Sequence, residues 1–327
     1  EVSAEELQKQ AQQVVITERD LSMIEIDKSI TGKTKLIGLI GNPVEHSISP
    51  QLHNTISRHL GREMTYVPFR VEKDDLKDAV KGLKALNFTG FNVTVPYKKE
   101  VMKYIDENSK EALLMGAVNT VKNIRGKLYG YNTDGEGFSR AFKEATGTAF
   151  RDKKIALLGA GGAARAIAVK LSLEGADSIA VINRTVSRAE DLCELVNNNI
   201  RRVAKPYGWD DDTAESVFAD SDIIINATSL GMHPDVDNYP YVKPIKFRKD
   251  QIVYDIIYNP ARTRFLQEAE RHGCVAVNGL GMLFYQGIYA YEIWTGIKLK
   301  EDFLKELFLE FSGLLGVRQK AKLSSKS

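Results

Sequence analysis

A glycine-rich turn in the middle of the chain has the residue types and spacing that bind the pyrophosphate of a dinucleotide. Gly159-Ala160-Gly161-Gly162-Ala163-Ala164 follows the apolar run Lys154–Leu158 and opens a segment of helical period. In this motif Gly159 permits the tight turn, Gly161 lets the backbone approach the pyrophosphate, and Ala164 replaces a third glycine where helix packs on strand. Free N–H groups at the helix start would bind the phosphates. The alternative is a tight turn without a ligand.

Two arginines beyond the next predicted strand favour a phosphorylated cofactor. Asn183-Arg184-Thr185 lies about 20 residues after the glycines, where an NAD enzyme usually has Asp or Glu for the ribose hydroxyls, and Arg188 follows one turn later. No carboxylate is present to repel a 2′-phosphate, and two guanidinium groups are present to bind it. We therefore predict NADP rather than NAD. The alternative is that both arginines are ordinary solvated residues at a helix start.

Two serines in the first third of the chain could bind an anion without arginine. Ser47 and Ser49 lie in Asn42-Pro43-Val44-Glu45-His46-Ser47-Ile48-Ser49-Pro50. We expect Ser49 to be the N-cap and Pro50 the first residue of a helix, so that both hydroxyls stand where the helix dipole favours negative charge. A substrate carboxylate would fit this position. The alternative is that Ser49 only caps the helix.

Three further polar motifs lie near predicted strand ends, where ligands of open α/β sheets bind. In Asn92-Val93-Thr94-Val95-Pro96-Tyr97-Lys98, strand alternation puts Asn92 and Thr94 on one face, and Pro96 ends the strand so that Lys98 begins a helix. The other two motifs are Ala117-Val118-Asn119-Thr120 and Tyr131-Asn132-Thr133-Asp134. Each of these two is equally compatible with a simple turn.

Short β-rich runs alternate with helical segments from Lys33 onward, which predicts βαβ units with parallel sheets. The predicted strands are Lys35–Ile40, Thr65–Val71, Phe88–Val95, Lys154–Leu158, Ser178–Ile182, Asp222–Asn226 and Ile252–Ile256. The predicted helices are Pro50–Leu60, Asp74–Leu86, Gly161–Leu173, Ser187–Val196, Thr263–His272, Gly281–Trp294 and Glu301–Leu315, with no strand after Ile256. We expect the last two helices to fold back on the first lobe.

The chain of 327 residues is long for one core, because single cores stop growing near ~250–300 residues. We predict an α/β protein of two domains, a substrate-binding α/β sandwich and a Rossmann-type NADP-binding domain, with a cleft between them. A turn-rich stretch, Gly126–Gly137, is the predicted break and hinge. The expected division is 1–31 as a tail or linker with a short polar helix near Glu5–Gln13, 32–134 plus 282–327 as the substrate domain, and 135–281 as the NADP domain.

Composition excludes several classes of partner. A net charge of +2 gives no field that would gather nucleic acid or anionic lipid. The two cysteines, Cys193 and Cys274, lack CxxC spacing, and the five histidines lack paired-ligand spacing, so neither a disulfide framework nor a metal site is expected. No apolar run reaches the ~18–20 residues of a membrane span. We therefore expect a cytoplasmic protein that binds small molecules, with a homodimer as the candidate assembly.

Nine motifs in a fixed order give the chain a close resemblance to the shikimate dehydrogenase family, from about Lys33 to Leu315. They are VEHSISP, NVTVPYK, GAVNT, YNTDGEG, GAGGAA, NRT, NATSLGM, YNPARTRFL and NGLGMLFYQG. The resemblance implies an NADP-dependent interconversion of 3-dehydroshikimate and shikimate in aromatic amino acid biosynthesis.

The resemblance also implies roles for individual residues. Lys98 and Asp134 would form the catalytic pair, with the lysine donating a proton during ketone reduction and working better as a base at alkaline pH. The implied substrate residues are Ser47 and Ser49 for the carboxylate, Asn92, Thr94, Asn119, Asp134 and Gln286 for ring hydroxyls, and Tyr258 near the carboxylate. Thr228, Ser229, Met232 and Gly281 match loops beside the ribose and nicotinamide.

Two alternatives stay open at the level of sequence. A quinate/shikimate dehydrogenase with relaxed choice of substrate and cofactor would share nearly all of these motifs, since the substrates differ little around the ring. A regulatory homologue that binds ligands without catalysis would keep the fold, although the presence of Lys98 and Asp134 speaks against it.

Overall fold

The computed structural model describes residues 30–211 and 213–314. The chain divides into two compact units, Glu1–Thr34 and Lys35–Ser327. In the first unit the described residues include a turn in which the Thr34 N–H donates to the Thr31 carbonyl oxygen. The short helix predicted near Glu5–Gln13 lies outside the described residues.

The first sheet of the second unit has six strands in the order β2-β1-β3-β5-β6-β4. The strands are β1 (Lys35–Gly41), β2 (Met64–Arg70), β3 (Gly90–Val93), β4 (Glu107–Asn108), β5 (Thr120–Ile124) and β6 (Lys127–Tyr131). Their connections contain α3 (Ser49–His59), α4 (Leu76–Ala85), α5 (Lys110–Met115) and two 3₁₀ helices, η1 (Lys73–Asp75) and η2 (Glu100–Tyr104). The strands β1, β2 and β3 are parallel, as the alternating pattern predicts.

The prediction of a purely parallel arrangement is wrong for this sheet, because β5 runs antiparallel to both β3 and β6. The reversal between β5 and β6 occurs in the tight turn that joins them, in which Arg125 and Gly126 both have positive φ, 52° and 81°. Two such residues form the kind of turn that reverses a strand without a crossover helix. Much of the stretch predicted as a break, Gly126–Gly137, is therefore β6 and the start of a helix.

The second sheet is parallel throughout, in the order β12-β11-β10-β7-β8-β9. Its strands are β7 (Lys154–Leu158), β8 (Ser178–Asn183), β9 (Ala204–Gly208), β10 (Ile223–Asn226), β11 (Ile252–Asp255) and β12 (Val275–Val277). The helices are α7 (Gly162–Leu173), α8 (Val186–Asn199), α9 (Ala214–Asp220) and α10 (Arg264–Arg271). Central strands such as β10 are buried at every position, which explains their continuous apolar sequence.

Two strands of this sheet, β9 and β12, were not predicted from the sequence. The prediction that no strand follows Ile256 is wrong, because β12 pairs with β11 at one edge, and β9 pairs with β8 at the other. Each is short and mostly only half-buried or exposed, so neither shows a clear apolar period. The predicted fold class is nevertheless confirmed: two α/β halves, the second of Rossmann type.

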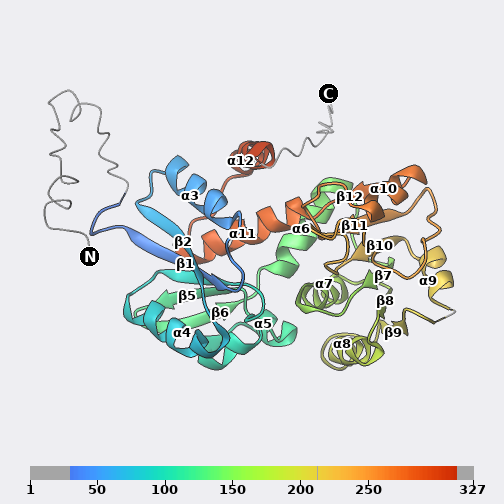
Figure 1. The fold of residues 1–327 in the computed structure, drawn as a ribbon, viewed down its shortest axis with the longest axis horizontal. Helices are drawn as coiled ribbons and strands as arrows, with labels where there is room; N and C mark the ends of the chain where they lie inside the picture. The colour runs from blue at the N-terminus through green and yellow to red at the C-terminus, as the bar shows by residue number, and fades with distance from the viewer. Residues whose placement is uncertain (1–29, 212, 315–327) are drawn as a thin grey trace, which may run out of the picture. The chain divides into compact units, whose positions relative to one another are not determined.

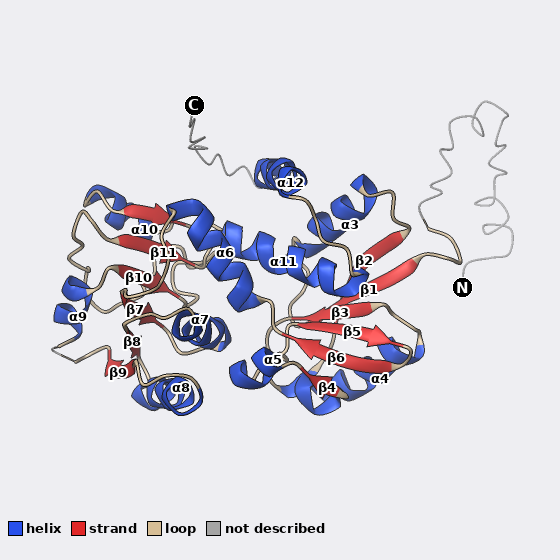
Figure 2. Ribbon diagram, turned by 180° about the vertical axis from the view of Figure 1, so that it is seen from behind, coloured by secondary structure: helices blue, strands red, loops and turns tan. Residues whose placement is uncertain are grey.

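Three helices complete the unit: α6 (Asp134–Thr146), α11 (Leu280–Thr295) and α12 (Glu301–Leu314). Figures 1 and 2 show α6 and α11 between the two sets of strands, packed against each other. α11 also contacts α3 and β5, while α6 contacts α7 and β12, so the pair joins both halves. None of the helices in the described ranges combines the length and the apolar character that a membrane crossing needs.

His53 of α3 occupies an apolar position beneath the first sheet. It is 1% exposed, stacks on Tyr66 with ring centroids 4.5 Å apart, and meets the edge of Trp294. Neither ring nitrogen has a hydrogen-bond partner among residues 30–211 and 213–314. Burial lowers the pKa of His53 to about 3, so the folded protein keeps this ring neutral.

We predict that His53→Phe flattens the loss of stability in acid. The unfolded chain binds a proton at His53 below about pH 6.5, whereas the folded chain does so only near pH 3, so stability falls as pH drops between these values. At about pH 5 this group alone costs roughly 2 kcal/mol. Urea unfolding at about pH 7 and about pH 5 measures the difference, with the exposed His272→Phe as control. A wild-type slope in His53→Phe would contradict the prediction.

Candidate active site

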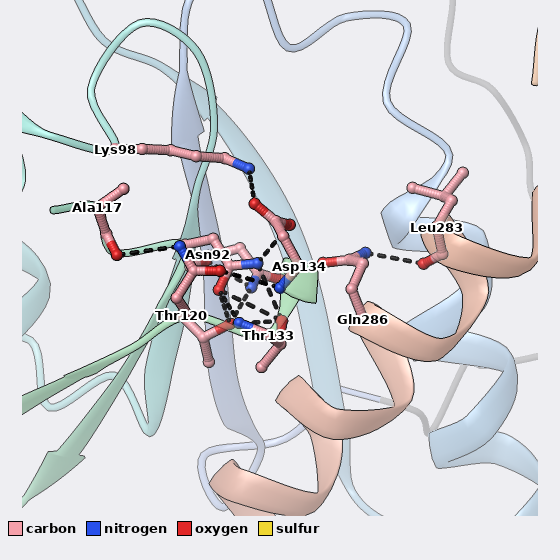
Figure 3. Close-up of polar contacts among 10 residues, drawn as sticks. Asn92, Lys98, Ala117, Thr120, Thr133, Asp134, Leu283 and Gln286 are labelled. Atoms are coloured by element: carbon pink, nitrogen blue, oxygen red, sulfur yellow. Dashed lines mark hydrogen bonds and ion pairs between the residues drawn. The ribbon is translucent and has the colours of Figure 1, made fainter. Parts of the chain in front are cut away.

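An ion pair joins the turn after β3 to the first residue of α6. Lys98 Nζ donates to Asp134 Oδ2 at 2.6 Å, and the two side chains are 26% and 8% exposed (Figure 3). The prediction that Lys98 begins a helix is wrong: it lies in a turn, and η2 starts only at Glu100. The strand is also shorter than the predicted Phe88–Val95: β3 ends at Val93, and Pro96 lies in the turn that carries the ammonium to Asp134. The sequence therefore indicated Lys98 and Asp134 as a pair, and the fold places the two side chains in contact.

The Asp134 carboxylate is held by more than the lysine. Asn119 Nδ2 donates to Asp134 Oδ1 at 2.8 Å and to Thr133 Oγ1 at 2.9 Å, while Asn119 Oδ1 accepts from the Thr133 N–H at 2.9 Å. Asp134 also stands in the first turn of α6, where the helix dipole favours negative charge. Because both amide hydrogens of Asn119 are used inside the protein, this residue orients the carboxylate.

Asn92 is similarly engaged. Its Nδ2 donates to the Asn119 carbonyl oxygen at 2.9 Å and to Thr120 Oγ1 at 3.0 Å, and its Oδ1 accepts from the Tyr66 hydroxyl at 2.9 Å. Sequence reasoning missed Tyr66 and Thr120 as parts of the site. Thr120 could have been predicted, because it is the last residue of the motif that contains Asn119. Tyr66 could not, because it lies in a strand, β2, whose sequence has no feature that marks a site.

The two serines lie at the start of α3, but not as predicted. The helix begins at Ser49 itself, Ile48 is the N-cap, and no side chain makes a capping hydrogen bond. The Ser47 hydroxyl accepts a hydrogen bond from the Ser49 N–H at 3.3 Å. The hydroxyl of Ser49 is therefore not used as a cap, which removes the simple alternative explanation for it. Thr94 is half-buried beyond the end of β3, against Gly41 of β1.

Gln286 reaches the same region from α11. Its Nε2 donates to the Leu283 carbonyl oxygen at 2.8 Å, and Figure 3 shows its side chain beside Asp134. A Cβ on Gly137 of α6 would lie 2.6 Å from the Gln286 backbone nitrogen. Glycine is therefore required for the close approach that sets Gln286 near Asp134. Tyr258 lies half-buried after β11, and burial raises the pKa of its hydroxyl.

The glycine turn has the conformation and the open surface that a dinucleotide needs. Gly159 has a φ of +104°, which favours glycine, and a Cβ there would lie 3.0 Å from the Ala227 carbonyl oxygen. Gly161, the N-cap of α7, and Gly162 are exposed, with no atom within 4 Å of a Cβ built on either. Ala164 is fully buried at the strand contact. The residues fit a pyrophosphate at the start of α7.

The arginines predicted to select the cofactor lie at the start of α8. Asn183 Nδ2 donates to the Thr185 carbonyl oxygen at 2.8 Å, which shapes the turn after β8. Arg184 and Arg188 are exposed, and within residues 30–211 and 213–314 neither guanidinium has an ion-pair or hydrogen-bond partner. Both groups are therefore available to an anionic ligand.

The remaining residues predicted beside the cofactor follow β10 or begin α11. Thr228 Oγ1 donates to Asn226 Oδ1 at 2.7 Å, Ser229 and Met232 are exposed, and Gly281 packs on Ala141 of α6. Gly281 thus has a packing role whatever it does for a ligand.

A buried aspartate that the sequence did not single out orders these loops. Asp255, at the end of β11, accepts hydrogen bonds from Asn226 Nδ2, the Ile257 N–H and Thr263 Oγ1. Asn226 in turn accepts from the Thr228 N–H and hydroxyl. Burial raises the pKa of Asp255 to about 7. The three donated hydrogen bonds favour the ionised form and oppose this rise. The loop after β10 and the segment leading to Tyr258 are thereby tied to one side chain.

The two halves of the site meet at the start of α6. A Cβ on Gly135 would lie 3.1 Å from the Ala166 carbonyl oxygen, in the α7 turn that follows the glycine motif. Asp134, one residue earlier, thus stands beside the helix that begins at Gly162. In the part of the chain that the structure describes, no group of three His, Cys, Asp or Glu side chains could hold a metal ion.

Family models match most of the chain. "Shikimate dehydrogenase substrate binding domain" matches residues 39–121, "Shikimate / quinate 5-dehydrogenase" matches 141–255, and "Shikimate 5'-dehydrogenase C-terminal domain" matches 279–304. The chain is 46% identical over 285 residues to a protein of Methanopyrus kandleri named shikimate dehydrogenase (NADP(+)), covering 87% of this chain and 98% of that relative.

Solved structures give the same grouping. A shikimate dehydrogenase in complex with NADP+ has a TM-score of 0.77 and 45% identity, covering 86% of this chain and 96% of its own. The shikimate 5-dehydrogenase of Listeria monocytogenes, in complex with shikimate and NAD, has a TM-score of 0.80 and 41% identity, covering 85% of this chain and 97% of its own.

We predict that Gly137→Ala destabilises the protein and that Gly82→Ala does not. A methyl group at 137 would press on the Gln286 backbone, and such overpacking costs about 1–3 kcal/mol. Nothing lies within 4 Å of a Cβ at Gly82 of α4, where alanine should gain about 0.5–1 kcal/mol from helix propensity. Chemical denaturation measures both variants. Equal free energies of unfolding would show that α6 and α11 tolerate separation.

Proposed function

We propose, from the premise that this chain belongs to the shikimate dehydrogenase family, that it is an NADP-dependent oxidoreductase that reversibly reduces 3-dehydroshikimate to shikimate. The observation that carries the proposal is the Lys98–Asp134 pair, held at 2.6 Å beside the helix that starts at the glycine turn. A general acid next to a dinucleotide site is what reduction of a ring ketone requires.

The chemistry divides between cofactor and protein. NADPH, when bound, supplies the hydride. Lys98 donates a proton to the oxygen that becomes the hydroxyl, and takes a proton from that hydroxyl in the reverse direction. Asp134 holds the ammonium in place, and its own position is set by Asn119 and by the start of α6. Because the lysine must be neutral to act as a base, oxidation of the alcohol should be faster at alkaline pH.

The substrate would be bound by side chains of the first half together with Gln286 and Tyr258. We assign the carboxylate to Ser47 and Ser49, whose hydroxyls lie at the start of α3, and also to Tyr258. We assign the ring hydroxyls to Thr94, Gln286, Asp134 and the accepting oxygen of Asn92, with Asn119 acting on them through Asp134. Each of the two amides gives both hydrogens to protein acceptors. Asn92 Oδ1 accepts from Tyr66 and keeps a second lone pair for a hydroxyl, whereas Asn119 Oδ1 already accepts from the Thr133 N–H and from Thr120 Oγ1.

The cofactor would lie along the carboxyl edge of the second sheet, where ligands of such sheets bind. We assign the pyrophosphate to the turn Gly159–Ala163, the 2′-phosphate to Arg184 and Arg188 with Asn183 and Thr185, and the nicotinamide end to Thr228, Ser229, Met232 and Gly281. The open surface of Gly161 and the exposed positions of both arginines support this assignment.

We also propose a division into domains that follows the two sheets. Residues 32–134 plus 282–327 would form the substrate domain, and 135–281 the cofactor domain, with residues 1–31 as a tail or linker. Both cysteines are free thiols, which suits a reducing cytoplasm. A homodimer remains part of the proposal, and sedimentation would test it.

The main competing function is a quinate/shikimate dehydrogenase with relaxed cofactor choice, because one matching family model is described for both substrates. Initial rates with shikimate and with quinate, each with NADP+ and NAD+ at alkaline pH, decide between the two. We expect the combination of shikimate and NADP+ to be fastest. Absence of turnover in all four mixtures would support a regulatory homologue without catalysis.

We predict that Lys98→Ala lowers kcat by at least ~10²-fold, the lower range for general acid–base catalysis, with little change in the KM for shikimate. Lys99→Ala, which removes the adjacent and exposed lysine, is the matched control. Steady-state kinetics in both directions measures the effect. A Lys98→Ala variant that keeps most of its turnover would exclude the lysine as the proton donor.

We predict that the double variant Arg184→Ala/Arg188→Ala raises the KM for NADPH about tenfold or more and leaves the KM for NADH nearly unchanged, because only NADPH carries the 2′-phosphate that two guanidinium groups would bind. Arg201→Ala/Arg202→Ala, a second pair of exposed arginines beyond α8, is the control. Equal effects on the two cofactors would sink the assignment.

A further inference from the structure

A chain of hydrogen bonds crosses the first sheet and ends at the Asp134 carboxylate. It runs from Tyr66 through Asn92, Thr120 and Asn119, with successive donor–acceptor distances of 2.9, 3.0, 2.9 and 2.8 Å. Every donor in it points toward the carboxylate. We propose that Thr120 is a positioning residue that transmits this orientation to Asn119 and thereby fixes Asp134 for Lys98; the inference rests on the function proposed above.

The first hydrogen bonds of this series fix the side-chain amide of Asn92. Its oxygen accepts from the Tyr66 hydroxyl, and its nitrogen donates to the Asn119 carbonyl oxygen and to Thr120 Oγ1. A flipped amide would bring two oxygens together, Oδ1 of Asn92 and the carbonyl oxygen of Asn119. The amide therefore has one favourable orientation, in which it gives a hydrogen to Thr120.

Because the Asn92 amide is fixed, the Thr120 hydroxyl is fixed too, and it orients the side chain of Asn119. A hydroxyl has a single hydrogen, and since Thr120 Oγ1 accepts from Asn92, that hydrogen is free to point at Asn119 Oδ1, 2.9 Å away. Thr133 Oγ1, the other hydroxyl oxygen that Thr120 meets among the described residues, is farther at 3.5 Å. Asn119 Oδ1 also accepts from the Thr133 N–H at 2.9 Å, so Thr120 and Thr133 together hold this oxygen, and the nitrogen of the same amide faces Asp134.

The opposite orientation of Asn119 would be costly. It would place an amide oxygen against Asp134 Oδ1, in an interior where unpaired polar groups are expensive and electrostatic repulsion is strong. The carboxylate would have to move, and the ammonium of Lys98, 2.6 Å from Oδ2, would follow it. A shift of this kind in the proton donor lowers turnover without touching the cofactor site.

Burial makes Thr120 a clean test of this mechanism. Its side chain is 0% exposed and that of Tyr66 is 2% exposed, so neither can touch a substrate directly. Any effect of Thr120 on turnover must pass through its neighbours. Threonine can be replaced by valine with almost the same shape and no hydroxyl, or by serine, which keeps the hydroxyl and loses a methyl group.

We expect Thr120→Val to lower kcat about tenfold or more, because a buried hydrogen bond next to a charged group is lost. The KM for NADPH should stay within about twofold, and Thr120→Ser should recover most of kcat. Tyr66→Phe should lower kcat less, since it acts two bonds further from Asp134. The controls are Thr55→Val and Tyr291→Phe, which remove hydroxyls from buried side chains outside the chain of bonds.

Crystal structures of the Thr120→Val and Thr55→Val variants supply a readout that needs no turnover. We expect the Lys98 Nζ to Asp134 Oδ2 distance to lengthen only in Thr120→Val. An unchanged distance, or a kcat in Thr120→Val no lower than in Thr55→Val, would overturn the inference. A wild-type protein that turns over neither shikimate nor quinate would instead refute the proposed function, and the distance would still decide the role of Thr120.

Discussion

The structure of the candidate active site depends on holding one buried carboxylate in a fixed position. Removing a carboxylate from water is expensive unless charge and hydrogen bonds replace the solvent. Asp134 receives all of these: the ammonium of Lys98, the amide of Asn119, and the dipole at the start of α6. These groups come from three separate segments, so the carboxylate also holds the turn after β3, the start of β5 and α6 together.

The crossing of α6 and α11 gives this arrangement its mechanical support. Small residues at the contact, Gly137 against Gln286 and Gly281 against Ala141, let the two helices approach more closely than larger side chains allow. Because α6 also packs on α7 and α11 on α3, the first turn of α6 is placed relative to both sheets at once. The Lys98–Asp134 pair of one half therefore has a defined position relative to α7 of the other.

In the second half, buried polar side chains order the loops at the carboxyl edge of the sheet. At the carboxyl edge of its sheet, Asp255 and Asn226 act as a small polar core that ties the loop after β10 to the segment after β11. The glycine turn packs against the same loop through Gly159. Backbone that would otherwise be irregular is thus ordered from beneath by side chains, while Gly161 and the two arginines remain open to solvent.

The sequence alone determined whatever depends on neighbours along the chain. The glycine turn, the helix that starts after it and the strands with continuous apolar runs were available from local spacing, whereas the pairing of Lys98 with Asp134 came from the resemblance carried by nine ordered motifs. The starts of α3 and η2 were displaced by a residue or two, because capping and turn geometry are chosen by the surroundings as well as by the residue type.

Only the tertiary structure decided which polar side chains face one another. Tyr66, Asn92 and Thr120 come from three strands and Asn119 directly precedes the third, so their mutual orientation depends on the antiparallel pairing of β3 with β5. The edge strands β9 and β12 are short segments that form strands because their backbones pair with those of β8 and β11. Hydrogen bonds between segments distant in the chain depend on distances that folding alone sets, and a sequence contains no local trace of them.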